Sequence, residues 1–201
     1  MTTVRKRSKM EKLTLLGMLT AIQIVLGYIN IPMPGGLSIT FIMIPVAVAA
    51  IAMGISGGLT MGTVFGLISF LQCFSVFGHS ALGATLVNYN AFLTFVQRVL
   101  SRALVGLMAA LVFAGLKKTK LPLYFKGAIT GFSAAFFNTL FFMGALVLFF
   151  SWTPEMQNSI AGRGFFTYLV ASVGINAVVE MAVAALVTGG VAVALKKTRQ
   201  I

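Results

Sequence analysis

The stretch Lys117-Lys118-Thr119-Lys120-Leu121-Pro122-Leu123-Tyr124-Phe125-Lys126 decides the fold. It places four lysines between two long apolar runs in the middle of the chain. Two further groups of basic residues flank apolar runs at the chain ends: Arg5, Lys6, Arg7, Lys9 and Lys12 near the start, and Lys196, Lys197 and Arg199 near the end. Basic residues concentrate at the cytoplasmic ends of membrane spans, so all three groups are expected on one side of a membrane.

Six apolar segments satisfy this constraint. The chain has 201 residues, of which 59% are hydrophobic and 9% charged, whereas soluble domains carry about 25% charged residues. In order, the segments are Leu13–Ile29, Ile39–Met53, Leu59–Phe77, Ala91–Leu116, Tyr124–Phe150 and Phe165–Leu195. Five spans would leave one basic group outside, but six return every group to the cytoplasm. The sequence therefore predicts an all-α polytopic membrane protein with six transmembrane helices, both termini inside, and a single transmembrane domain over residues 1–201.

The second segment departs from a simple span. It is short, contains Pro45 and ends at Gly54-Ile55-Ser56-Gly57-Gly58, so we expect a tilted, kinked or partly re-entrant helix. On the opposite side of the membrane, the predicted outer loops are Asn30–Ser38, Gly78–Asn90 and Ser151–Gly164. The second outer loop ends in the polar sequence Asn88-Tyr89-Asn90, which is a candidate part of a binding site for a solute arriving from outside.

Three ionisable residues fall inside the predicted spans: Arg98, Arg102 and Glu180. Each costs about 2.5–3.5 kcal/mol at a helix centre, so each should face protein or a water-filled cavity. Arg98 and Arg102 are four residues apart and share a helix face. Amide side chains at similar depths could line the same cavity in the outer half of the bundle: Gln97, Asn138 and Asn176.

Two other interpretations stay open for these charges. Arg102 and Glu180 could form a buried ion pair, with the amides serving only as interhelical hydrogen bonds. Arg98 alone could extend to the outer lipid headgroups. One anion cannot neutralise two cations, however, and the surplus positive charge favours an anionic ligand group such as a carboxylate.

Small residues recur at four-residue spacing on two predicted helices. Gly17 and Ala21 form one such pair, and Gly58, Gly62 and Gly66 form a longer ridge. Small side chains let two helices approach closely, within one chain or between two proteins.

The sequence contains no phosphate-binding loop, no metal-ligand cluster and no nucleophile–base set, so we expect no enzyme activity, no metal and no cofactor. Because the basic residues lie at the ends of apolar runs, they indicate a lipid bilayer rather than nucleic acid as the partner. Three acidic residues leave little for ion-coupled transport. A chain that binds a solute without visible energy coupling needs a partner protein.

Several segments of the chain resemble the substrate-binding S components of energy-coupling factor (ECF) vitamin transporters. They are Leu15-Leu16-Gly17-Met18-Leu19-Thr20-Ala21, Thr40-Phe41-Ile42-Met43-Ile44-Pro45-Val46 with the turn to Gly58, and Gly174-Ile175-Asn176-Ala177-Val178-Val179-Glu180. The resemblance covers nearly the whole chain and implies an S-component bundle in the cytoplasmic membrane of a prokaryote. It also implies capture of a vitamin from outside, followed by toppling against a transmembrane coupling subunit that two ATPase subunits drive. Gly17 and Ala21 match the family's Ala-x-x-x-Ala face for the coupling subunit, with glycine in place of the first alanine.

The subgroup that the chain is most similar to includes pantothenate-specific proteins. Pantothenate is a small anion with amide and hydroxyl groups, which suits two arginines and several amides. Another vitamin, such as folate or riboflavin, is the first alternative. A stand-alone secondary transporter and a purely structural membrane subunit are the others.

Overall fold

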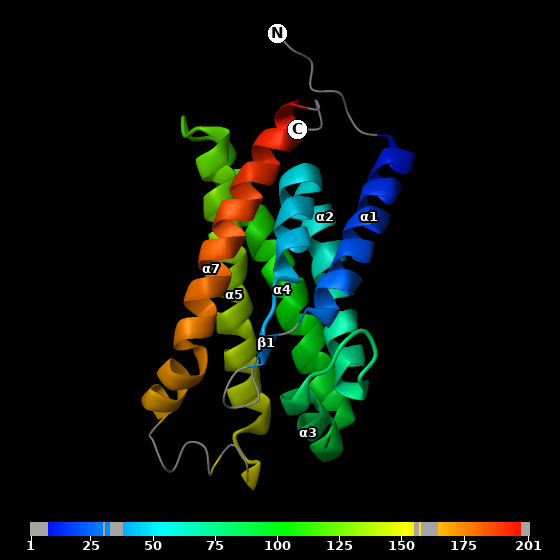
Figure 1. The fold of residues 1–201 in the computed structure, drawn as a ribbon, viewed down its shortest axis with the longest axis vertical. Helices are drawn as coiled ribbons and strands as arrows, with labels where there is room; N and C mark the ends of the chain where they lie inside the picture. The colour runs from blue at the N-terminus through cyan, green and yellow to red at the C-terminus, as the bar shows by residue number, and fades with distance from the viewer. Residues whose placement is uncertain (1–7, 30, 33–37, 155–156, 158–164, 198–201) are drawn as a thin grey trace.

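The computed structural model describes residues 8–29, 31–32, 38–154, 157 and 165–197. Long helices run side by side along the longest axis of the molecule (Figure 1). The elements in chain order are α1 (Lys9–Tyr28), β1 (Ile31–Pro32), β2 (Ser38–Ile39), α2 (Met43–Leu71), the 3-10 turn η1 (Gln72–Phe74), α3 (Ala81–Tyr89), α4 (Ala91–Lys117), α5 (Leu123–Phe150) and α7 (Phe165–Lys197).

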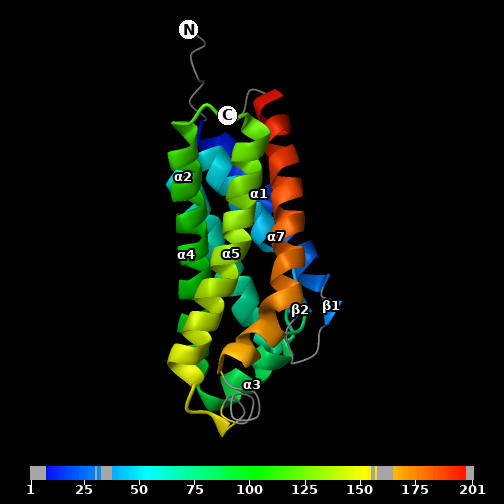
Figure 2. The same ribbon diagram turned by 90° about the vertical axis from the view of Figure 1, so that its left-hand side faces the viewer.

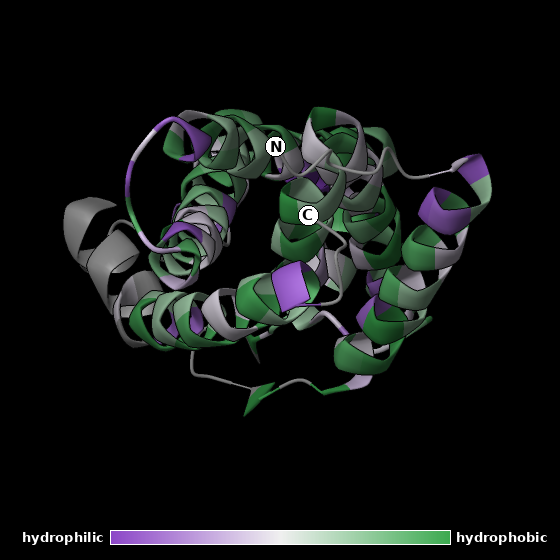
Figure 3. Cartoon of the chain, turned by 90° about the horizontal axis from the view of Figure 1, so that it is seen from above, coloured by the Kyte–Doolittle hydropathy of each residue, from purple (hydrophilic) through white to green (hydrophobic). Residues whose placement is uncertain are grey.

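The structure is all-helical apart from a two-residue antiparallel ladder between β1 and β2. Within the described residues, five helices are long and apolar enough to cross a membrane: α1, α2 continued through η1, α4, α5 and the Asn176–Lys197 part of α7. Seen from above, these helices are coloured mainly as hydrophobic, and hydrophilic residues are few (Figure 3). The predicted multi-pass helical architecture is confirmed.

Helix α2 reverses direction at Gly54. The backbone there has φ 70° and ψ −148°, a conformation that glycine adopts at little cost. After the reversal, a Cβ placed on Gly58 would lie 3.2 Å from the Cβ of Ala50, eight residues earlier. The predicted breaker therefore divides α2 into a short first limb, Met43–Met53, and a longer second limb, Ile55–Leu71. In Figure 1 the first limb starts in the middle of the molecule rather than at its end.

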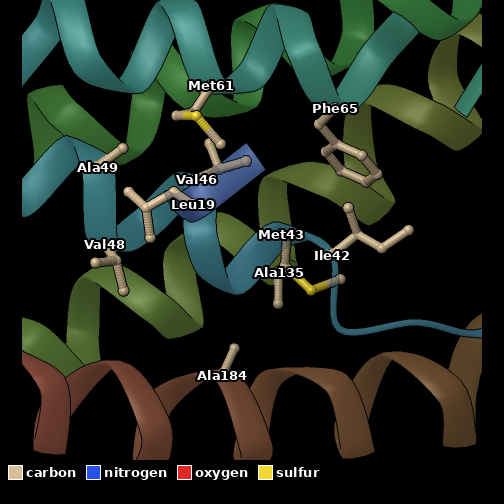
Figure 4. Packing of buried hydrophobic residues seen from close by; sticks show 10 residues of the cluster. All are labelled: Leu19, Ile42, Met43, Val46, Val48, Ala49, Met61, Phe65, Ala135 and Ala184. Carbon is tan, nitrogen blue, oxygen red and sulfur yellow. The ribbon is translucent and has the colours of Figure 1, made fainter. Parts of the chain in front are cut away.

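The first limb of α2 occupies the centre of the bundle. Met43, Val46, Ala47 and Ala49 are fully buried on it, and Pro45 is tolerated because it falls in the first turn. Residues from four neighbouring segments surround this limb in the largest core cluster: Leu19 of α1, Met61 and Phe65 of the second limb, Ala135 of α5 and Ala184 of α7 (Figure 4). Small side chains on this limb let several helices pack around it at once.

The second limb of α2 packs very closely on α4. A Cβ added to Gly58 would collide with the carbonyl oxygen of Gly106, and one added to Gly62 would meet the carbonyl oxygen of Arg102. A Cβ on Gly66 would lie 2.6 Å from the Cα of Val99. The predicted small-residue ridge therefore has its partner inside the chain, and that partner is α4.

The predicted basic groups gather at one end of the molecule. The start of α1, the turn between α4 and α5, and the end of α7 lie together there (Figures 1 and 2). Lys9, Lys117 and Lys196 belong to these segments, whereas Arg5, Lys6, Arg7 and Arg199 lie outside the described residues. The basic groups predict this shared end, because an even number of membrane crossings between two groups leaves both on the same side.

The glycine contact between α2 and α4 predicts opposite effects for the same substitution at two positions of α4. Gly106→Ala inserts a methyl group against the Gly58 carbonyl and should cost about 1–3 kcal/mol or more. Gly115→Ala, which meets nothing within 4 Å, should be neutral or stabilising by up to about 1 kcal/mol. Thermal unfolding in detergent, followed by a dye that reacts with the buried Cys73 thiol, measures both. Equal unfolding temperatures for the two variants would contradict the close contact.

Candidate functional site

Arg98 and Arg102 lie buried on one face of α4. Their side chains are 4% and 5% exposed, so Arg98 does not extend to the lipid headgroups, and that alternative is wrong. The Cζ atoms of Arg98 and Arg102 lie 5.1 Å and 4.6 Å from the centre of the Phe142 ring on α5. Arg102 also lies 5.3 Å from the ring of Phe65 on α2. The aromatic faces offer partial negative charge to the cations without neutralising them.

Serine hydroxyls accept hydrogen bonds from both guanidinium groups. Arg98 donates from Nη1 to Ser69 at 3.2 Å and from Nη2 to Ser80 at 3.1 Å. Arg102 donates from Nη1 to the adjacent Ser101 at 3.0 Å. Among the described residues, the buried Nε–H groups of both arginines find no acceptor. Buried donors of this kind are costly unless something accepts from them.

Glu180 on α7 is buried, but it is not directly paired with an arginine. Its carboxylate accepts a hydrogen bond of 2.8 Å from the backbone N–H of Thr40, just after β2. Arg102 interacts with Glu180 electrostatically, yet within the described residues no ion pair or hydrogen bond joins the two side chains. The expected alternative of a direct Arg102–Glu180 ion pair is therefore not found. Glu180 instead ties the segment before α2 to α7.

Among the described residues, one amide on each of α4, α5 and α7 carries a buried oxygen without a hydrogen-bond donor: Oε1 of Gln97, Oδ1 of Asn138 and Oδ1 of Asn176. The Nε2 group of Gln97 donates to the carbonyl oxygen of Phe142 at 3.4 Å. A polar ligand with both donors and acceptors could satisfy such oxygens together with the unpartnered arginine N–H groups.

Helix register brings these side chains to one level of the bundle. Gly131 of α5 packs against Ala184 of the antiparallel α7. Asn138 lies about 10 Å further along α5, which is level with the turn of α7 from Asn176 to Glu180. Phe142, one turn beyond Asn138, lies against Arg102. The arginines, the amides and the carboxylate thus come from α4, α5 and α7, where α5 packs against both α4 and α7.

The predicted loop residues Asn88, Tyr89 and Asn90 have different surroundings. Asn90 is exposed and caps α4, because its Oδ1 accepts from the N–H of Leu93 at 2.9 Å. Asn88 is also exposed, and Tyr89 forms an edge-to-face pair with Trp152, with ring centres 6.0 Å apart. This pair connects the end of α3 to the segment after α5. Most of the other two predicted outer loops lies outside the described residues.

Sequence patterns missed several residues that contact the charged groups: Thr40, Phe65, Ser69, Ser80, Ser101 and Phe142. The contact of Ser101 with Arg102 could have been predicted, since the two residues are adjacent in the chain. The others come from different helices or from the segments between them, and no spacing along one helix indicates which distant residue a charged side chain will contact. Among the described residues, His, Cys, Asp and Glu do not form a group of three or more that could hold a metal ion.

Gly17 and Ala21 lie on the outward face of α1. Leu19, Gln23 and Gly27 are buried at four-residue intervals and mark the face that packs against α2. Gly17 and Ala21 are exposed on the other side, and a Cβ on Gly17 would have nothing within 4 Å. This small-residue pair therefore differs from the ridge on α2, because no described helix of the chain covers it.

Comparison with protein families decides which class of membrane protein carries this site. Residues 11–192 match the family model described as "ECF transporter, substrate-specific component". The chain belongs to this family. Its members are subunits of ECF importers that provide the substrate specificity, not enzymes. A comparison with curated proteins gives no match. The resemblance inferred from the sequence is thus confirmed at the level of the family, and the buried polar cluster is the natural candidate for its substrate site.

The Thr40–Glu180 hydrogen bond predicts how this S component responds to substitution of Glu180. Glu180→Ala leaves the Thr40 N–H without its acceptor and should destabilise the protein by about 1–3 kcal/mol. Glu180→Gln retains an acceptor oxygen and should recover most of that loss. Thermal unfolding of the purified variants measures the difference. If Glu180→Gln is as unstable as Glu180→Ala, the negative charge beside Arg102 matters more than the hydrogen bond.

Proposed function

We propose that this S component binds pantothenate and delivers it to the cytoplasm of a prokaryotic cell as part of an ECF importer. The observation that supports this most is the pair of buried arginines on α4, which within the described residues donate hydrogen bonds to serines and lie against aromatic rings, with no carboxylate in direct contact. In a low-dielectric environment, a buried cation without a paired anion is strongly destabilised. A ligand carboxylate would supply the missing charge and accept from the free N–H groups.

Pantothenate suits the remaining groups as well. Its amide and hydroxyls can donate to the unpartnered oxygens of Gln97, Asn138 and Asn176 and accept from nearby donors. Its short alkyl body can lie against Phe65 and Phe142. Folate is also an anion and is the nearest alternative, while riboflavin is neutral and would leave the arginines uncompensated.

In the proposed orientation, the two limbs of α2 count as separate membrane segments, giving six in all, with both termini in the cytoplasm. The basic end then faces the cytoplasm and the buried polar cluster lies in the outer half of the bundle. The α3 segment ends in Asn88, Tyr89 and Asn90 near the outer surface, where it could close over the bound vitamin. ATP hydrolysis by two partner ATPases would drive the toppling that exposes the site to the cytoplasm.

The exposed face of α1 is the proposed surface for the transmembrane coupling subunit. Gly17 and Ala21 would allow a helix of that subunit to approach the backbone of α1 closely. This surface lies on the side of α1 that faces away from the bundle, so docking and vitamin binding would not compete for the same side chains.

Binding measurements on the purified protein test the choice of vitamin. Isothermal titration with pantothenate, folate, riboflavin and thiamine should show an affinity for pantothenate at least about tenfold higher than for the others, a difference of about 1.4 kcal/mol. Tighter binding of folate would reassign the substrate and retain an anion site. Binding of no vitamin would favour a structural subunit.

Uptake measurements test the proposed docking face. Gly17→Leu and Ala21→Leu should leave pantothenate binding within about twofold of wild type but reduce ATP-driven uptake by the reconstituted complex about tenfold or more, because overpacking a helix contact costs about 1–3 kcal/mol. Gly144→Leu on α5 is the matched control, since Gly144 is also exposed with nothing within 4 Å. Uptake by the S component alone in an ion gradient would indicate a secondary transporter instead.

A further inference from the structure

The two arginines on α4 make different kinds of contact. We infer that Arg98 is a positioning residue that holds α3 onto the bundle, and that discrimination for a negatively charged ligand resides in Arg102. The inference rests on the proposed function only for the identity of the ligand. The structural role of Arg98 stands on contacts within the protein.

Arg98 joins three elements through its two terminal nitrogens. Nη1 donates to Ser69 on the second limb of α2, and Nη2 donates to Ser80 immediately before α3. Because Arg98 itself belongs to α4, one guanidinium group links α2, α3 and α4. Its fork geometry allows this, since an arginine donates in fixed directions from separate nitrogens.

The hydroxyl of Ser80 and the backbone of Gly83 place α3 directly on this guanidinium. Ser80 Oγ accepts from Arg98 and also from the N–H of Gly83 at 3.2 Å, so the residue that caps α3 is the one that Arg98 holds. Gly83 is buried, and a Cβ on it would lie 2.7 Å from Nη2 of Arg98. The glycine thus lets the first turn of α3 rest against the arginine.

Arg102 has a simpler environment. Among the described residues its guanidinium donates to Ser101, the preceding residue on the same helix, and therefore ties no second element to α4. The rings of Phe65 and Phe142 lie against it, and Glu180, which interacts with it electrostatically, accepts from Thr40 instead. Arg102 is thus the cation whose charge is left for a ligand, whereas both terminal nitrogens of Arg98 already donate to serines of other elements.

Two ligands that differ only in charge separate the two roles. Pantothenate and its neutral alcohol analogue, in which a hydroxymethyl group replaces the carboxylate, would be titrated into wild type, Arg98→Gln and Arg102→Gln. Arg102→Gln should weaken pantothenate binding by about 10- to 100-fold and change the affinity for the alcohol little, because the charged hydrogen bond to the carboxylate is lost and the alcohol never makes it. Arg98→Gln should weaken both ligands by the same factor. A charge-selective loss in Arg98→Gln would overturn the inference.

Hydrogen exchange of the ligand-free protein gives a second readout that needs no ligand. Arg98→Gln should accelerate exchange of the amides in α3, residues 81–89, while Arg102→Gln should leave them at the wild-type rate. Ser80→Ala keeps both guanidinium groups and should accelerate hydrogen exchange of the same α3 amides. It therefore replaces Arg98→Gln in this experiment if Arg98→Gln does not fold. Unchanged α3 exchange in both Arg98→Gln and Ser80→Ala would overturn the positioning role. If wild type binds neither pantothenate nor the alcohol, the proposed function fails, and the exchange measurement still decides the role of Arg98.

Discussion

The close approach of α2 and α4 is the constraint on which the rest of this S component depends. Gly62 and Gly66 bring the second limb of α2 against the backbone carbonyl oxygens of Arg102 and Arg98. The same contact that packs the helices therefore sets the position of both arginines. With α4 held there, their side chains extend towards Phe142 of α5 and the polar side chains at the same level. Bulkier residues on α2 would separate the helices and move the charged groups together with the backbone.

The chain has few acidic residues that could neutralise the buried arginines. The chain contains three, and one of them, Glu180, is buried and accepts a hydrogen bond from the backbone N–H of Thr40. Hydroxyl groups and aromatic rings surround the arginines and lower the cost of burying them without cancelling their charge. A site built in this way keeps its attraction for an anion, because a built-in carboxylate partner would compete with the ligand for the same guanidinium group.

The molecule separates its proposed tasks in space. The polar side chains lie on α4, α5 and α7, the candidate docking face lies on the outer side of α1, and the lysines at the start of α1, the turn between α4 and α5, and the end of α7 lie at one end. Helix α1 nevertheless stays connected to the centre, since the amide of the buried Gln23 donates to the carbonyl oxygens of Ile42, immediately before the first limb of α2, and of Met61 on the second limb. A partner protein that moves α1 would therefore move the central limb with it.

Much of the architecture was predictable from the sequence, because the relevant forces act locally. Apolar runs, basic groups and the breaker at Gly54 report burial in lipid, charge placement and backbone freedom, which depend on a residue and its near neighbours. The burial of Arg98 and Arg102 on one face followed from their spacing. Tertiary structure alone decided which small-residue pair packs inside and which stays open, and that Glu180 meets Thr40 rather than Arg102. Those outcomes depend on how separate helices are rotated and aligned, and no pattern along one segment carries that information.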